Sequence, residues 1–187
     1  MQIQKNKSRD TETAHMYKRI LIVGCSGAGK STLAVKLGQK LALPVVHLDK
    51  LWWRPQWQSV TESEFDELLM PELKKPRWVI EGNFARTFAL RLEHSELCIM
   101  LDYPTELCLK SVIERVEKYR GRTRPDMTEG CPEQADPEFV EWIRSFDNNV
   151  KPKMLDTMKS SGVPYKIFRA REQAEEWLSG LPFAENE

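Results

Sequence analysis

The residues best suited to chemistry lie close together near the N-terminus, where the sequence reads Gly24-Cys25-Ser26-Gly27-Ala28-Gly29-Lys30-Ser31. This run fits G-x-x-x-x-G-K-[ST], a loop that binds nucleotide phosphates. Its glycines let backbone N–H groups point inward at phosphate oxygens, and a following helix adds the positive end of its dipole. In such a loop, Lys30 reaches the β- and γ-phosphates and the Ser31 hydroxyl binds Mg²⁺. The sequence therefore predicts that ATP is bound by Gly24, Ser26, Gly27, Ala28, Gly29, Lys30, Ser31 and Thr32.

Two flanking elements are expected to position this loop. Ile20–Val23 is a short apolar run typical of a buried parallel strand. After the loop, Leu33, Leu37 and Leu41 recur every four residues, which predicts an amphipathic helix. The order strand, glycine-rich loop and helix is the context that a phosphate-binding loop needs.

The rest of the chain alternates between expected strands and helices. Further short apolar runs predict strands at Val45–Leu48, Trp78–Ile80, Leu97–Leu101 and Tyr165–Phe168. Helices are expected over residues 61–73, where Thr61 and Glu64 form a capping box, over 105–116 with Thr105 as cap, over 138–158, and from Arg171 onward. This alternation predicts an α/β fold with a doubly wound, five-stranded parallel sheet and helices on both faces.

Three acidic residues follow the expected strands at the sheet edge where α/β proteins bind ligands. Asp49 could orient or deprotonate the hydroxyl of a phosphate acceptor. Glu81 has the position of the acid in nucleotide kinases, and Asp102 follows an apolar strand as a Walker B acid does. Either could hold the waters of a bound metal ion, and we favour Glu81; the alternative is an ordinary acid at a strand end.

An unusual cluster of tryptophans, Trp52, Trp53 and Trp57, follows the second strand. It predicts either a platform on which a flat or sugar-like acceptor stacks or a small core in which the loop packs its own indoles. Gly82 and Asn83 are expected beside the acceptor, and Arg86 or Arg144 is expected to bind an anionic group of the acceptor.

An arginine-rich segment, residues 118–137, follows the helix that begins near Thr105. We interpret it as a mobile lid in which Arg120, Arg122 and Arg124 close over the transferring phosphates; a solvated basic turn is the alternative. Arg171 begins the last helix and could stack on the nucleotide base.

Length and composition predict one domain over residues 18–187, preceded by a polar extension over 1–17 that we expect to be disordered. Met16 could be the true start. Basic and acidic residues are balanced at 28 each, so bulk charge gives no support for nucleic-acid binding. No apolar run approaches the roughly 20 residues of a membrane span, and a signal peptide pattern is lacking, so we expect a cytoplasmic protein. The oligomeric state is left open.

Beyond these single features, the chain resembles the DNA topology modulation proteins, which are adenylate kinase-like P-loop proteins. Besides the phosphate loop, the resemblance is carried by residues 48–57, 78–84, 101–104, 123–127 and 129–133, within a likeness that covers residues 18 to about 178. It implies a nucleotide kinase-like P-loop NTPase fold, ATP as donor and an arginine lid. True nucleoside monophosphate kinases carry Asp-Gly-x-Pro-Arg after the third strand, whereas this chain has Glu81-Gly82-Asn83-Phe84-Ala85-Arg86.

Three functional hypotheses result. The first is a kinase that transfers the γ-phosphate of ATP to a small-molecule or nucleotide acceptor. The second is an ATP-dependent regulator of DNA topology that binds nucleic acid, and the third is a nucleotide-binding scaffold without catalysis. A GTPase is disfavoured because the chain has no Asn-Lys-x-Asp motif to read guanine.

Overall fold

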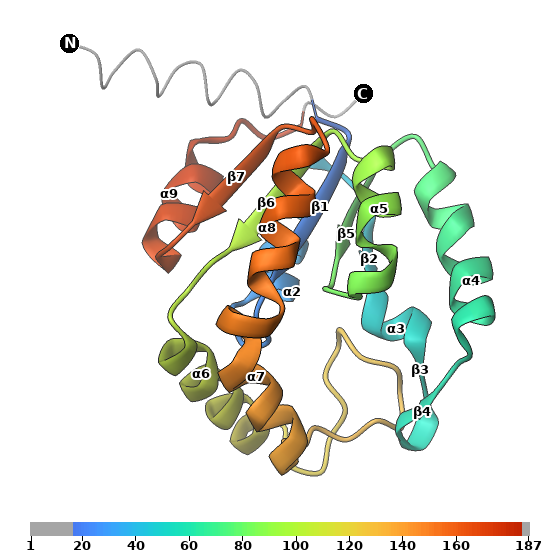
Figure 1. Ribbon diagram of the computed structural model, residues 1–187, viewed down its shortest axis with the longest axis vertical. Coiled ribbons are helices and arrows are strands. Elements are labelled where there is room, and N and C mark those ends of the chain that lie inside the picture. The colour runs from blue at the N-terminus through green and yellow to red at the C-terminus, as the bar shows by residue number, and fades with distance from the viewer. Residues whose placement is uncertain (1–16, 185–187) are drawn as a thin grey trace.

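The computed structural model of this chain describes residues 17–184, so Met16 and nearly all of the expected N-terminal extension lie outside the described part. Its central feature is a parallel sheet (Figure 1) of five strands in the order β2-β5-β1-β6-β7. The strands are β1 (Arg19–Gly24), β2 (Val45–His47), β5 (Trp78–Glu81), β6 (Leu97–Leu101) and β7 (Tyr165–Phe168). The predicted α/β fold with five parallel strands is confirmed.

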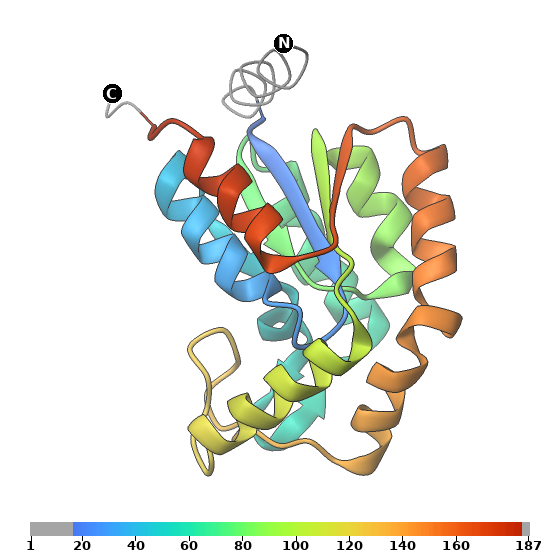
Figure 2. The same cartoon turned by 90° about the vertical axis from the view of Figure 1, so that its left-hand side faces the viewer.

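Burial explains why the strands read as continuous apolar runs. Leu21, Ile22 and Val23 of β1 are fully buried, because helices cover both faces of the sheet. Figure 2 shows α2 (Lys30–Leu41) and α9 (Arg171–Gly180) on one face, with α5 (Phe88–His94) and α8 (Lys151–Ser160) on the other. The remaining long helices are α4 (Glu62–Lys74), α6 (Thr105–Lys118) and α7 (Pro137–Asn149).

Two helix predictions need correction, whereas the predicted capping box of Thr61 and Glu64 is present at α4. Thr105 does not cap α6: it is the first helical residue, and its hydroxyl donates to Asp147 at 3.0 Å. The single helix predicted over 138–158 is two helices, α7 and α8, which meet at Val150. Pro152 has no N–H to donate to the carbonyl four residues earlier, which removes one helical hydrogen bond and favours the break at this point.

The tryptophan-rich segment folds into a compact hairpin after β2. It comprises α3 (Leu48–Trp52), β3 (Trp53–Arg54), the 3-10 turn η1 (Pro55–Trp57) and β4 (Gln58–Ser59). After β5, a second 3-10 turn, η2 (Ala85–Thr87), leads into α5. Both connections leave carboxyl ends of neighbouring strands, so they border the same edge of the sheet.

The lid segment, defined here as residues 119–136, joins α6 to α7 without a helix. Two isolated bridges, Arg120–Glu133 and Thr123–Pro132, pair its outgoing and returning halves. In Figure 1 this segment folds back towards α3 and the β3–β4 hairpin. Within residues 17–184, none of the helices has the length and apolar character needed to cross a membrane.

Candidate nucleotide and acceptor site

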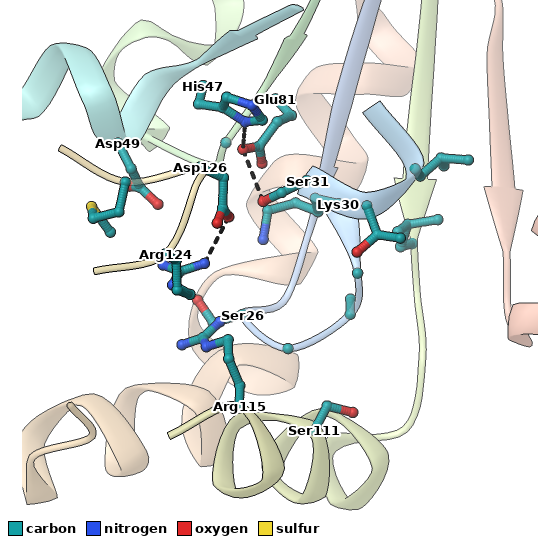
Figure 3. A pocket seen from close by; sticks show the side chains of 18 of the residues that line it. Ser26, Lys30, Ser31, His47, Asp49, Glu81, Ser111, Arg115, Arg124 and Asp126 are labelled. Atoms are coloured by element: carbon teal, nitrogen blue, oxygen red, sulfur yellow. Dashed lines mark hydrogen bonds and ion pairs between the residues drawn. The ribbon is translucent and has the colours of Figure 1, made fainter. Parts of the chain in front are cut away.

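A large cavity of about 1480 Å³ lies at the carboxyl edge of the sheet. The phosphate loop and α2 form its floor, and residues from α6, the lid segment, the tryptophan hairpin and the turn after β5 form its walls (Figure 3). Segments that are distant in the sequence therefore meet in one enclosure. The cavity is wide enough for a nucleotide and a second small molecule.

The phosphate loop has the curled backbone that the motif predicts. Gly27 has a φ of +84°, and a Cβ at that position would lie 2.2 Å from the carbonyl oxygen of Cys108, so a side chain does not fit there. The Lys30 ammonium donates to the Cys25 carbonyl at 3.1 Å, which keeps it folded over the loop. The loop therefore presents backbone N–H groups and a lysine at the start of a 12-residue helix.

Glu81 links the phosphate loop to β2. The Ser31 hydroxyl donates to Glu81 Oε1 at 3.1 Å, and His47 Nδ1 lies 2.8 Å from the same oxygen. The Glu81 side chain is almost completely buried, and strand register explains the geometry, since Glu81 pairs with Ile22 of β1 and with His47 of β2. The carboxylate is thereby fixed beside the serine that would contact Mg²⁺.

Asp126 of the lid segment reaches the same group. Burial alone would raise its pKa, but Arg124, a hydrogen bond from Ser31 and the nearby His47 outweigh that effect, so the pKa of Asp126 lies below its usual value. Asp126 is therefore charged at neutral pH, at 2.7 Å from the Arg124 guanidinium. Within the described part of the chain, no group of three or more His, Cys, Asp and Glu residues could hold a metal ion unaided.

Asp102 lies elsewhere, although the sequence left it as an alternative to Glu81. Its carboxylate pairs with Lys151 at 3.0 Å and lies 3.8 Å from Arg169. It does not line the cavity, so the structure does not bring it to Ser31. The oxygen donors beside Ser31 are those of Glu81 and Asp126, which is the ligand chemistry that Mg²⁺ prefers.

Asp49 lines the cavity from the first turn of α3. Burial raises its pKa to about 6, with a further upward contribution from the negative charge of Glu81. Lys30 and Arg124 act in the opposite direction but do not cancel the shift. The pKa of Asp49 is therefore closer to neutral pH than that of an ordinary aspartate. Such a pKa suits a group that accepts a proton from a hydroxyl.

The arginines of the lid segment do not act together as the sequence predicts. Arg124 lines the cavity, whereas Arg120 and Arg122 do not. Arg120 is exposed and lies 3.4 Å from Glu117, and Arg122 donates to the Lys118 carbonyl at 3.1 Å. Both residues lie on the outer side because they pair with the end of α6, so the prediction that they bind phosphates needs correction.

A different arginine, Arg115, faces the cavity from α6. It pairs with the buried Glu133 at 2.9 Å, and Arg124 contacts the other oxygen of the same carboxylate. Burial and the neighbouring Arg124 lower the pKa of Arg115, which reflects two guanidinium groups held close together. In Figure 3, Arg115 and Arg124 lie on the lid side of the phosphate loop near Ser26. This pair is the cationic wall above the loop.

All five predicted acceptor residues from the tryptophan cluster and the turn after β5 line the cavity: Trp52, Trp53, Trp57, Gly82 and Asn83. The packing role of the cluster is observed, because Trp52 packs against Phe65 with ring centroids 5.4 Å apart, whereas stacking of an acceptor on it stays a prediction. The Asn83 side-chain oxygen accepts a hydrogen bond from Gly24 N–H at 3.1 Å. The turn is thereby tied to the phosphate loop.

The predicted anion-binding arginines of the acceptor site are both outside the cavity. Arg86 pairs with Asp66 of α4 at 2.7 Å, and Arg144 lies 3.7 Å from Glu141 on the same helix. Neither residue lines the cavity. Arg86 faces away because α4 offers it a carboxylate on the outer surface, so the assignment of these two arginines to the acceptor needs correction.

Arg171 is at the far end of the cavity, where α9 begins. Its guanidinium donates to the Ser111 hydroxyl of α6 at 2.5 Å. The two residues therefore connect the walls on the side opposite to the tryptophan hairpin. This position is compatible with contact to a nucleotide base, as the sequence predicts.

Sequence reasoning assigned no role in this site to His47, Asp126 or Glu133, and it counted Arg115 among the arginines of the lid without giving it a role of its own. His47 is the last residue of β2, at the carboxyl edge where such sheets bind ligands, which was a usable sign that it borders the site. The other three depend on how the lid segment folds back onto α6. No local pattern predicts that return.

Comparisons with known proteins support the fold. No protein-family model matches this chain. It is 25% identical over 136 residues to the uncharacterized protein YqaC of Bacillus subtilis (strain 168), covering 71% of this chain and 75% of that protein. This identity is too low to show membership of a family.

Among solved structures, a shikimate kinase from Acinetobacter baumannii in complex with shikimate is similar, with a TM-score of 0.58 and 17% identity over 90% of this chain and 95% of that one. A shikimate kinase from Bacteroides thetaiotaomicron has a TM-score of 0.53 and 20% identity, covering 87% and 95% of the two chains. A gluconokinase from Sinorhizobium meliloti has a TM-score of 0.50 and 14% identity, covering 87% and 90%. The chain therefore has the α/β fold of P-loop kinases.

Proposed function

We propose that this chain is an ATP-dependent kinase that transfers the γ-phosphate to a hydroxyl group of a small molecule. The observation that carries the proposal is the convergence of a phosphate-binding loop and a half-buried acid in one cavity. Lys30 and Ser31 lie on the loop, and Asp49 faces them from the start of α3. The shared fold with small-molecule kinases supports the same reaction class.

The loop and the lid segment would divide the work of charge neutralisation. Lys30 and the loop N–H groups bind the β- and γ-phosphates, while Arg124 and Arg115 reach the phosphate oxygens from the opposite side. A bound Mg²⁺, held through Ser31 with Glu81 and Asp126 nearby, would supply further positive charge at the phosphates. Fixed cations in a site sheltered from water stabilise the charge of the transition state strongly.

Asp49 is the residue we assign to the acceptor hydroxyl. A carboxylate accepts the hydrogen bond of a hydroxyl and can take its proton as the new P–O bond forms. Its pKa of about 6 leaves it charged at pH 7 and more basic than an ordinary aspartate. The tryptophan hairpin and the lid segment border the cavity on two sides and would limit the access of water to the reacting groups.

The first test is ADP formation from ATP and Mg²⁺ with a panel of nucleosides, nucleoside monophosphates and small hydroxylated metabolites. Lys30→Ala should abolish turnover, because the variant lacks the ammonium that would neutralise charge on the β- and γ-phosphates. Lys40→Ala is the matched control on the same helix, since Lys40 lies outside the cavity and donates to Ser179. Turnover that persists in Lys30→Ala would contradict the proposal.

The resemblance to the DNA topology modulation proteins supports a second hypothesis, ATP-dependent binding to DNA. The balanced charge of the chain argues against it, because contacts with backbone phosphates require a basic surface. Unchanged electrophoretic mobility of plasmid DNA at low salt, with and without ATP, would exclude it. Tight ATP binding without turnover for any acceptor would instead indicate a non-catalytic scaffold.

A further inference from the structure

The charges around the cavity are divided between its two ends. Lysines and arginines among the described lining residues belong to α2, α6, the lid segment or the start of α9: Lys30, Lys36, Arg115, Lys118, Arg124 and Arg171. The opposite end, between the tryptophan hairpin and the turn after β5, is lined by acidic, aromatic and amide side chains. A phosphate donor fits the first end, and the second end is left for the acceptor.

The acceptor end has one carboxylate of its own, Asp49 of α3. Glu81 and Asp126 also line the cavity, but they lie beside Ser31, where a bound Mg²⁺ would offset their charge. Lys30 and Arg124 are the nearest cations, and Arg124 already pairs with Asp126 and Glu133. An anionic group on the acceptor would therefore meet negative charge without a free cation to compensate it.

The turn after β5 gives this end no positive charge, although two arginines follow it. Arg86 points outward to Asp66. Arg91 is completely buried, and its guanidinium donates to the carbonyls of Gly82 and Phe84 at 2.9 Å each, as well as to Asn83. Phe84 has a φ of +35°, so these bonds hold a strained turn in place. Arg91 therefore acts on the backbone and does not line the cavity.

We propose that the acceptor is an uncharged, hydroxyl-bearing ring compound, such as a neutral sugar, a cyclitol or a nucleoside, and not a phosphate ester or a carboxylic acid. This inference rests on the proposed kinase function and narrows its substrate class. The rings of Trp53 and Trp57 pack edge to face, with their centroids 5.4 Å apart. Together they offer apolar surface to the ring of the acceptor. Asp49 accepts the hydrogen bond of the reacting hydroxyl.

The test uses pairs of acceptors that differ mainly in one anionic group: D-glucose and D-gluconate, adenosine and AMP, and methyl shikimate and shikimate. ADP formation by the full chain is measured with ATP and Mg²⁺. In any pair that supports turnover, kcat/KM should favour the neutral member by at least about tenfold, equivalent to 1.4 kcal/mol. A preference for the anionic member would overturn the proposal.

A binding measurement decides the question of charge even when no pair is turned over. Inorganic phosphate is titrated calorimetrically into the chain with its phosphate loop filled by Mg²⁺ and a non-hydrolysable ATP analogue. We expect no saturable binding up to about 20 mM, because the acceptor end has no cation available to it. The nucleotide-free chain, which can bind phosphate in its loop, is the positive control.

Saturable phosphate binding to the nucleotide-filled chain would refute the inference directly. The two measurements also separate the two proposals. Absence of ADP with every acceptor would count against the kinase function, whereas the phosphate titration reports the charge preference of the acceptor end without any need for catalysis.

Discussion

Glu133 is the residue on which the closed position of the lid segment depends most. Its side chain is only 2% exposed and accepts from Arg115 at 2.9 Å, while its other oxygen contacts Arg124. Its backbone N–H also donates to the Arg122 carbonyl at 3.0 Å. We predict that Glu133→Gln, which keeps the shape but removes the charge, opens the lid segment.

The magnitude depends on the partners that remain. Removing one partner of a buried ion pair costs roughly 3–5 kcal/mol, because the other charge is left uncompensated. In this variant Arg124 still pairs with Asp126 at 2.7 Å, and Arg115 retains some contact with solvent. The cost should therefore lie at the lower limit of this range. A loss of about 3 kcal/mol corresponds to an increase of roughly 150-fold in the population of the open form.

Trypsin reports this population, since Arg120 and Arg122 are cleavage sites within the segment. When opening and closing are fast, the cleavage rate follows the open fraction. Glu117→Gln is the matched control: this glutamate is 69% exposed and lies 3.4 Å from Arg120, so a rise of at most about fivefold is expected. Equal cleavage of Glu133→Gln and the control would refute the argument.

Three further outcomes are expected. The rate of phosphate transfer should fall about tenfold per pH unit below the Asp49 pKa of about 6, because the protonated acid cannot accept the hydroxyl proton. A pH–rate profile of Asp49→Asn should lack this dependence. Gly27→Ala should weaken ATP binding by at least about tenfold in calorimetry, since its Cβ would lie 2.2 Å from the Cys108 carbonyl oxygen; wild-type affinity would contradict this. Glu81→Gln should raise the Mg²⁺ concentration for half-maximal turnover by about tenfold, whereas Asp102→Asn should leave it unchanged. An equal effect of the two variants would show that the carboxylate beside Ser31 has no particular role in holding Mg²⁺.

The sequence predicted the sheet well because its strands are buried on both faces. Four-residue apolar runs such as Ile20–Val23 are typical of strands buried in the centre of a domain. The phosphate-loop motif also requires a helix directly after the loop that follows the first of these strands. The helix over 138–158 failed for the opposite reason. Its apolar face is nearly continuous across Val150, so periodicity alone concealed the break beside Pro152.

The site was predictable only where its chemistry is local. Glu81 and Asp102 both follow apolar strands, and sequence could not rank them by geometry. Strand register decides, because β5 lies between β1 and β2 and so places Glu81 between Ser31 and His47. Lys151 of α8, 49 residues further along, pairs instead with Asp102. Partners at such separations leave no local pattern.

The contacts of the lid segment imply that the two ends of the cavity respond together. The segment that brings Arg124 and Asp126 to the phosphate loop also contacts the tryptophan hairpin through hydrogen bonds that include Thr128 to Trp53, Gln56 to Gly130, Cys131 to Arg54 and Trp57 to Pro132. Opening the segment must break these bonds or move the hairpin with it. The tryptophan hairpin at the acceptor end and the lid segment at the nucleotide end should therefore move together. A ligand that stabilises the closed hairpin also stabilises the closed segment, so acceptor and nucleotide should strengthen each other's binding by the same factor.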